Sequence, residues 1–183
     1  MVILIGGTSH TGKTLLAQKL LEMHHFPYLS IDHLKMGLIR SGQTALTPMD
    51  DDKLTLLLWP IVREMIKTAI ENRQNLIVEG CYIPGNWYED FSEEYLSEIR
   101  CRFLIMTEAY IRKNLGKIRS HANAIEQRLD ETLDPEDLIR DNREVYNTCR
   151  QEERILLTDG YPANLAHVFF GRNGETDIFQ RKG

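Results

Sequence analysis

Residues Gly7 to Thr14 have the types and the spacing to bind a chain of phosphates. Their sequence, GTSHTGKT, satisfies the pattern GxxxxGK[ST]. The pattern follows the apolar run Val2–Ile5 and precedes a segment with apolar residues at helical spacing. In a strand, loop and helix of this kind, the loop N–H groups surround a polyphosphate and the helix dipole favours its charge. We therefore expect nucleotide phosphates on the loop backbone, at Gly7, Thr8, Ser9, His10, Thr11 and Gly12.

The last two residues of the pattern have chemistry of their own. Lys13 can reach the outer phosphates as a point charge and act in catalysis, and the Thr14 hydroxyl can coordinate Mg²⁺. A nucleotide and Mg²⁺ are therefore the expected cofactors. The alternative is a glycine-rich strand-to-helix turn that holds no ligand.

Acidic residues follow two of the expected strands. Asp32 ends the run Pro27–Ile31, where a carboxylate can accept the proton of a substrate hydroxyl or hold Mg²⁺ through water. Helix capping is its alternative role. Glu79 ends the run Leu76–Val78 and can orient magnesium waters or bind substrate, or it can be an ordinary solvated or ion-paired strand end. Tyr82 lies in the next loop, Cys81–Trp87, which is suited to one wall of a pocket.

The segment Ile111–Arg128 reverses the sign of the chain's charge. It contains five basic residues against one acidic residue, and its arginines are Arg112, Arg119 and Arg128. A basic segment that closes over the nucleotide would stabilise a transferring phosphoryl group, with Arg112 on the nucleotide. The alternative is a solvated helical face with scattered charges. Arg140 and Arg143 share a face of the following helix and either converge on substrate phosphate or pair with Asp137, Asp141 or Glu144.

The elements that must position these residues alternate along the chain. Apolar, strand-like runs occur at Val2–Ile5, Pro27–Ile31, Leu76–Val78, Cys101–Met106 and Ile155–Leu157. Helical patterns occur at Lys13–Met23, Leu34–Arg40, Asp50–Asn72, Pro135–Glu153 and Leu165–Phe170. Strands without polar alternation, separated by helices, predict an α/β fold whose parallel sheet is covered on both faces.

Composition limits the possible classes of protein. The 183 residues, 42% hydrophobic and 27% charged, predict a single domain over 1–183. A net charge of −5 argues against nucleic acid and membrane surfaces as partners. The three cysteines form no CxxC pair, which argues against structural zinc or disulfides and favours a reducing cytoplasm. The apolar face of Leu54–Ile66 is either core or a homo-oligomer interface.

The loop, the acidic strand ends and the basic segment together resemble the nucleoside monophosphate kinase-like superfamily of P-loop small-molecule kinases. That group includes adenylate, shikimate and gluconate kinases, chloramphenicol phosphotransferase and proteins labelled 2-phosphoglycerate kinase. The resemblance implies a three-layer α/β/α fold, a five-stranded parallel sheet in the order 2-3-1-4-5, and a small helical lid at about 111–134. It also implies that Asp32 is the base or orients the substrate, and that Arg119 or Arg128 acts from the lid.

The sequence differs from that of the nucleotide kinases in the residues expected to bind the phosphoryl acceptor. Those enzymes hold the acceptor phosphate with an arginine after the third strand, whereas this loop reads Cys-Tyr-Ile-Pro-Gly-Asn-Trp. Arg40 is another candidate for an acceptor phosphate. A missing NKxD pattern favours ATP over GTP. We expect an ATP- and Mg²⁺-dependent kinase acting on a hydroxyl or phosphate of a small metabolite. The alternatives are a regulatory P-loop ATPase without an acceptor, and a nucleoside or nucleotide kinase.

Overall fold

Strand β1 (Val2–Gly7) forms the centre of the sheet, and all six of its residues are buried. In the computed structural model, which describes residues 1–121, 133–158 and 168–170, five strands pair in the order β2-β3-β1-β4-β5. The others are β2 (Tyr28–Ser30), β3 (Leu76–Glu79), β4 (Ile99–Met106) and β5 (Arg154–Leu157), and every pairing is parallel. The expected α/β class and the kinase-type strand order are confirmed.

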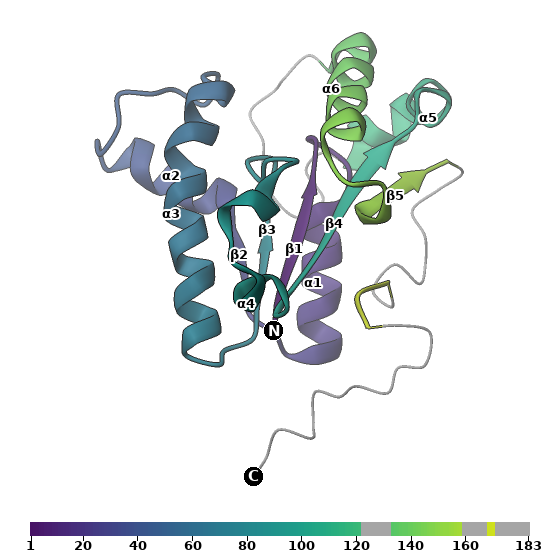
Figure 1. The fold of residues 1–183 in the computed structure, drawn as a ribbon. Coiled ribbons are helices and arrows are strands. Elements are labelled where there is room, and N and C mark those ends of the chain that lie inside the picture. The colour runs from purple at the N-terminus through teal and green to yellow at the C-terminus, as the bar shows by residue number, and fades with distance from the viewer. Residues whose placement is uncertain (122–132, 159–167, 171–183) are drawn as a thin grey trace.

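Side chains of β1 alternate between two cores, one on each face of the sheet. Ile3 and Ile5 pack with Leu16 and Leu20 of α1 (Lys13–His24). Val2 and Leu4 pack on the opposite side, in the core that α3 (Asp51–Glu71) supplies with its buried apolar residues. The helices therefore form two layers around the sheet, as expected (Figure 1).

The remaining helices lie around the carboxyl ends of the strands and on the α3 face (Figure 1). Helix α2 (Ile31–Arg40) follows β2 directly. Helices α5 (Glu108–His121) and α6 (Pro135–Thr148) share a small core with the last residues of β4 and β5, Met106 and Leu157. The short helices η1 (Trp87–Asp90) and α4 (Glu93–Leu96) connect β3 to β4, and a single turn, η2 (Gln151–Glu153), precedes β5.

Two expected boundaries are wrong. The second strand ends at Ser30, because the buried Ile31 already begins α2, so Asp32 lies in the first helical turn and not at the strand end. The helix expected to reach Glu153 ends at Thr148, because Cys149 is extended (φ −83°, ψ 158°) and returns the chain toward β5. Of the last expected helix, Leu165–Phe170, only residues 168–170 belong to the described part.

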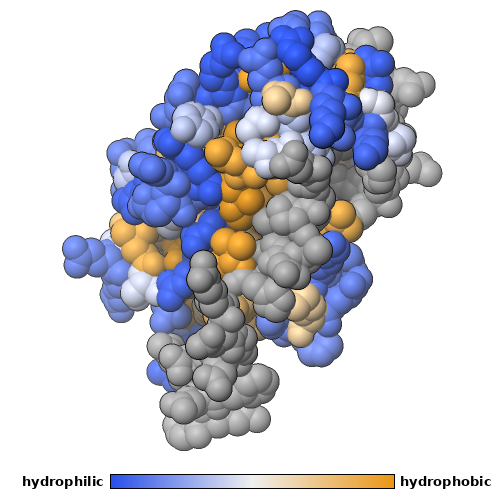
Figure 2. All heavy atoms as spheres, turned by 90° about the vertical axis from the view of Figure 1, so that its right-hand side faces the viewer, coloured by the Kyte–Doolittle hydropathy of each residue, from blue (hydrophilic) through white to orange (hydrophobic). Residues whose placement is uncertain are grey.

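The sheet ends at β5, whose outer side chains reach the surface. Leu156 is 45% exposed there. Figure 2 views the molecule from this side, and apolar surface lies at its centre between hydrophilic areas. In the described residues, no helix has the length and apolar character needed to cross a bilayer.

Candidate active site

The loop between β1 and α1 has the backbone that its glycines predict. Gly7 has φ +132°, and a Cβ there would lie 2.4 Å from the carbonyl oxygen of Leu104, so only glycine fits. Gly12 precedes α1 in the left-handed region, and His10 also has a positive φ of 65°. The Thr11 hydroxyl donates to the carbonyl of Thr8 at 2.9 Å and closes the loop across its middle.

The amino end of α1 is suited to an anion. Its N-cap residue, Gly12, contributes no capping side chain, and the first turn contains no acidic residue. The first N–H groups of a helix have no partner within the helix, and the helix dipole is positive at that end. These groups are therefore suited to the phosphates that the loop sequence predicts.

Lys13 is held over the loop. Its side chain is buried, with the residue 4% exposed, and its Nζ donates to the carbonyl of Thr8 at 2.6 Å. The same Nζ lies 3.3 Å from the Sγ of Cys81, in the loop after β3. The ammonium of Lys13 thus stands between the phosphate-binding loop and the neighbouring strand end.

Thr14 and Glu79 form an oxygen pair beside the loop. The Thr14 hydroxyl donates to Oε1 of Glu79 at 3.3 Å, and Glu79 is only 1% exposed. Glu79 aligns with Ile5 of β1 and Ser30 of β2, which places it at the carboxyl edge of the sheet. Carboxylate and hydroxyl oxygens are hard ligands that suit Mg²⁺. The described residues hold no group of three or more His, Cys, Asp or Glu arranged as a metal site. Mg²⁺ fits such a pair because it takes its other ligands from water and phosphate.

A second group of polar side chains, here called the Tyr82 cluster, lies beyond β3. It consists of Asp32, Lys35, Asp51 and Tyr82. Lys35 Nζ lies 2.6 Å from Asp32 Oδ1 and donates to the Tyr82 hydroxyl at 3.0 Å. That hydroxyl in turn donates to Asp51 Oδ1 at 2.7 Å. The cluster joins the first turns of α2 and α3 to the loop after β3.

Tyr82 is the centre of this cluster. The residue is 3% exposed, and burial together with the hydrogen bond to Asp51 raises the pKa of Tyr82 above its ordinary value. The negative charge of Asp32 acts on that pKa in the same direction. Tyr82 is therefore protonated at neutral pH, and its hydroxyl donates to Asp51.

The loop that contains Cys81 and Tyr82 is anchored at its far end. Trp87 is 4% exposed and belongs to the core, and its Nε1 donates to both carboxylate oxygens of Glu153 at 3.2 and 3.4 Å. A Cβ on Gly85 would lie 2.6 Å from the backbone of Thr148 at the end of α6.

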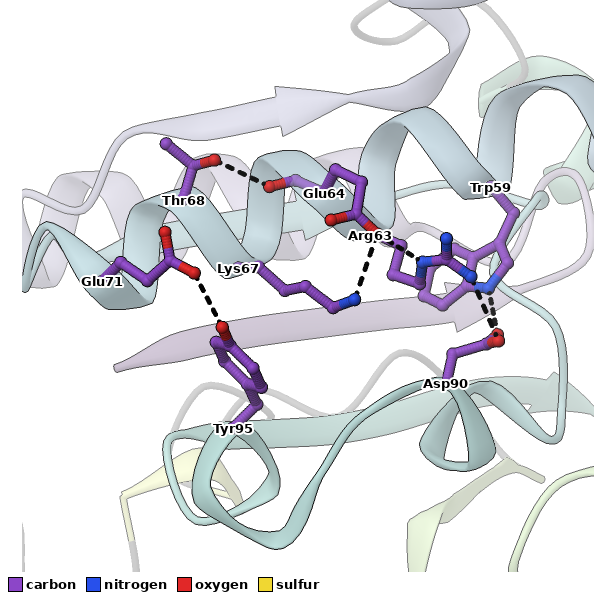
Figure 3. A network of polar contacts seen from close by, with 8 residues as sticks. All are labelled: Trp59, Arg63, Glu64, Lys67, Thr68, Glu71, Asp90 and Tyr95. Carbon is purple, nitrogen blue, oxygen red and sulfur yellow. Dashed lines mark hydrogen bonds and ion pairs between the residues drawn. The ribbon is translucent and has the colours of Figure 1, made fainter.

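The segment after this loop is tied to α3 by the polar contacts drawn in Figure 3. Asp90 accepts from Trp59 Nε1 at 2.7 Å and from Arg63 at 3.3 Å, and Tyr95 donates to Glu71 at 2.7 Å. Tyr82 thus belongs to a loop that is fixed at both ends.

The predicted arginines do not join these groups in the described structure. Arg112 pairs with Glu108 and Glu136, Arg140 with Asp137 and Asp141, and Arg143 with Glu108. All three are exposed, and the pairing of Arg140 is the one expected as the alternative to phosphate binding.

Arg119 and Arg40 also lie apart from the loop's contacts. Arg119 is exposed and donates to the carbonyl of Leu133 at 2.9 Å. Arg40 is exposed at the end of α2, about 12 Å along the helix axis from Asp32. Arg128 lies outside the described residues. Of the expected lid at about 111–134, the described start belongs to α5, where Ile111 and Ile118 are buried.

Sequence reasoning missed three residues of the site, Lys35, Asp51 and Cys81. Lys35 is three residues after Asp32 on one helix, and this spacing was the available signal. In the sequence, Asp51 resembles any acidic residue at the start of a helix. Its place in the cluster depends on the hydrogen bond that it accepts from Tyr82. Cys81 has no sequence signal, because its contact with Lys13 spans 68 residues.

Comparison with known proteins finds solved structures that are similar to this chain at low sequence identity. No protein-family model matches the chain, and no curated protein matches it significantly. A deoxyadenosine kinase from M. mycoides with bound dATP is 12% identical, over 93% of this chain and 97% of that chain, with a TM-score of 0.49.

Two other similar structures belong to kinds of kinase that the sequence resembles. A gluconokinase from Sinorhizobium meliloti 1021 is 14% identical, over 91% of this chain and 87% of that chain, with a TM-score of 0.49. A shikimate kinase from Aquifex aeolicus vf5 is 16% identical, over 88% of each chain, with a TM-score of 0.47. The strand order agrees with the fold that the resemblance to the nucleoside monophosphate kinase-like superfamily implies. Function has to be argued from the residues of the site.

Proposed function

We propose that this protein is a cytoplasmic, ATP- and Mg²⁺-dependent kinase that phosphorylates a small metabolite. One observation carries the proposal: the phosphate-binding loop and the carboxylate-containing Tyr82 cluster meet where Lys13 contacts Cys81, the residue before Tyr82. A site that only held a nucleotide would have no need of a second, ordered polar cluster beside the phosphates. A kinase needs one, because the acceptor must be held in line with the transferring group.

The nucleotide half of the site is formed by the loop and α1. The loop N–H groups and the amino end of α1 bind the phosphates, and Lys13 neutralises charge on the outer ones. Thr14 and Glu79 would hold Mg²⁺, Glu79 through water. Bound there, Mg²⁺ would supply positive charge that offsets the negative charge developing on the phosphate oxygens.

The acceptor half is formed by the Tyr82 cluster. Asp32 accepts the proton of the acceptor hydroxyl as the hydroxyl oxygen forms its bond to the γ-phosphorus. The bond between that phosphorus and the bridging oxygen breaks, and ADP leaves with the electron pair. Lys35 holds Asp32 in place through their 2.6 Å contact.

The test is product formation by wild type and two variants, with ATP consumption followed against a panel of small hydroxyl compounds and products identified by mass. We expect Lys13→Met to weaken ATP binding and to lower turnover by about 100-fold or more. We expect Asp32→Asn to lower kcat by about 100-fold or more while ATP affinity stays unchanged. Asp52→Asn, an exposed residue of the same charge, is the control and keeps full activity.

Two outcomes would contradict the proposal. Full turnover by Asp32→Asn would remove Asp32 as the base. ATP binding or slow hydrolysis without a phosphorylated product, across the whole panel, would indicate the regulatory ATPase instead.

A further inference from the structure

Helix α3 presents apolar side chains to solvent on its outer side. The helix lies along one side of the molecule (Figure 1). Leu56 is 79% exposed, Ile61 is 38% exposed, and Pro60 is exposed between them. Leu57, which is half-buried, lies one turn before Ile61. These four residues are here called the α3 patch. Apolar surface that gathers in one place and has a polar rim marks a site of interaction.

The other sides of α3 are covered by residues of the same chain. Leu58 and Val62 pack in the core on the sheet. Trp59 and Arg63 donate hydrogen bonds to Asp90 of η1 (Figure 3). The α3 patch is therefore the part of the helix that a partner can reach.

A charged residue lies at each end of the α3 patch, and the two have opposite signs. Lys53 precedes the patch, Glu64 follows it, and both are exposed. About three helical turns separate them, so they share one face of α3 and lie about 16 Å apart along its axis. Within the chain, Lys53 pairs with Asp50, and Glu64 pairs with Arg63 and Lys67. Exposed ion pairs contribute little stability, so Lys53 and Glu64 can turn to new partners.

This pattern of charge is complementary to itself. Two copies of a helix that cross a two-fold axis at right angles run antiparallel, and each contact between them occurs twice. With the axis midway between Lys53 and Glu64, the lysine of each copy faces the glutamate of the other. In the same register Leu56 faces Ile61, and Leu57 faces Pro60. The match of both charge and apolar surface favours a second copy of this chain as the partner.

We propose that this protein forms a two-fold symmetric homodimer in which the α3 patch packs antiparallel against the same patch of a second copy, with Lys53 and Glu64 paired across the interface. The contact is limited to one helix face, and interfaces of small area are transient. We expect a dimer Kd of about 10–100 µM.

The test is sedimentation velocity of the full-length protein over about a 100-fold range of concentration around this value. The average mass of wild type should rise from one toward two protomers. Lys53→Glu and Glu64→Lys each place like charges opposite one another, and each should raise the dimer Kd by about 10-fold or more. An equal mixture of these two variants should form a heterodimer about as tight as the wild-type dimer, because opposite charges then meet at both pairs.

A second comparison tests the apolar part of the interface. Leu56→Gln should raise the dimer Kd by about 10-fold or more, because it removes apolar area at the centre of the contact. Met23→Gln makes a similar change at an exposed position of α1 and should leave the Kd unchanged. Matched melting temperatures at low concentration check that all variants are folded.

Three results would overturn the proposal. Wild type could remain monomeric over the whole range, or it could form a dimer that Leu56→Gln does not weaken. A mixture of the two charge variants that stays monomeric would overturn the antiparallel pairing of Lys53 with Glu64. None of these measurements depends on kinase activity, so the dimer and the proposed function are tested separately.

Discussion

At the scale of single residues, Cys81 connects the two halves of the site. Its thiol is half-buried, lies 3.3 Å from Lys13 Nζ and 3.8 Å from Ser9 Oγ, and precedes Tyr82 directly. Cys101 and Cys149 are buried in the core, at 4% and 3% exposure. The three cysteines therefore differ in access and in distance from the phosphate-binding loop.

This difference predicts selective alkylation. Native protein treated with iodoacetamide should take up one adduct, at Cys81, because reagents reach exposed thiols first. Mg²⁺ and a non-hydrolysable ATP analogue should slow the labelling several-fold by covering the thiol. Peptide mass spectrometry gives the site and the rate. Cys81→Ala is the control and should show almost no labelling, whereas labelling of Cys101 at the same rate would contradict the arrangement.

The residues of the site could be predicted only in part from the sequence. A contiguous pattern identified Gly7 to Thr14, because a phosphate-binding loop depends on neighbours in sequence. Asp32 and Glu79 could be proposed from strand ends. Lys35, Asp51 and Cys81 depend on contacts between separate segments, such as Tyr82 with Asp51 across 31 positions. No periodicity or spacing encodes such contacts.

At the scale of elements, glycines have opposite roles in α2 and beside β3. Gly37 lies within α2, and a Cβ there would meet no atom within 4 Å. Gly80 follows β3, and a Cβ there would lie 2.8 Å from the Cβ of Ile31 at the start of α2. The close approach of α2 to the end of β3 therefore requires glycine at one of the two positions only.

The same substitution should have opposite effects at these positions. Gly37→Ala should raise stability by about 0.5–1 kcal/mol, because alanine favours the helix. Gly80→Ala should lower it by about 1–3 kcal/mol, because the Ile31 Cβ cannot rotate away. Urea unfolding measures both. Gly116→Ala, at another open position within α5, should resemble Gly37→Ala, and destabilisation at Gly37 would contradict the packing of α2.

The turn η2 holds the far end of the Tyr82 loop through a buried acid. Burial raises the pKa of Glu153, and the Trp87 hydrogen bond and the charge of Arg150 offset this only in part. A carboxyl group whose pKa is higher in the folded than in the unfolded state stabilises the fold fully at pH values below the unfolded pKa, which is 4.5 here. This contribution to the free energy of unfolding is lost as the pH rises through the folded pKa.

Glu153→Gln should therefore change the pH dependence of stability. The amide stays neutral and can still accept from Trp87, so the variant should melt about 2 °C higher than wild type at pH 7. The difference should shrink toward pH 4, where the wild-type carboxyl is protonated. Thermal melting from pH 4 to pH 8 tests this, with the exposed neighbour changed by Glu152→Gln as the control. A loss of stability at pH 7 that shrinks toward pH 4 would show that ionised Glu153 is favourable and would contradict the prediction.

Strands were the elements that sequence predicted best. Their apolar runs are uninterrupted because the parallel sheet is buried on both faces. The exception is β2, where only Tyr28–Ser30 pair, because β2 lies at the edge of the sheet and Ile31 already packs as part of a helix. Helices η1 and α4 were not predicted. Each has four residues, too few for periodicity, and packing against α3 fixes their place.

At the scale of the whole molecule, the charged residues behind the net charge of −5 are unevenly distributed along the chain. Acidic residues gather at 50–52 and 89–94, and the basic excess lies in the segment 111–128. The described arginines of that segment and of α6 have acidic or carbonyl partners at the surface, so they present no continuous basic face.

Nucleic acid should therefore not bind. A 5′-hydroxyl oligonucleotide should show a Kd weaker than about 100 µM at 150 mM salt, because the chain has a net charge of −5 and the described arginines of α5 and α6 already have partners. It should not stimulate ATP consumption. Fluorescence anisotropy at 50 and 150 mM salt measures the affinity. Tight binding that weakens steeply between these two salt concentrations would contradict the prediction and indicate a kinase of nucleic-acid ends.

The position of β1 in the sheet also affects how the molecule folds. The first strand of the chain lies in the middle, and its partners are Leu76–Glu79 on one side and Ile99–Leu104 on the other. The carbonyl of Leu104 packs against Gly7. The start of the phosphate-binding loop therefore takes its final shape only after β4, almost 100 residues later in the sequence, has paired with β1. Pairing over such distances in sequence slows folding and leaves the apolar first strand uncovered during synthesis. During synthesis the segment Gly7–Thr14 is thus exposed before the strand that completes it has formed, in the period when a chaperone is most useful.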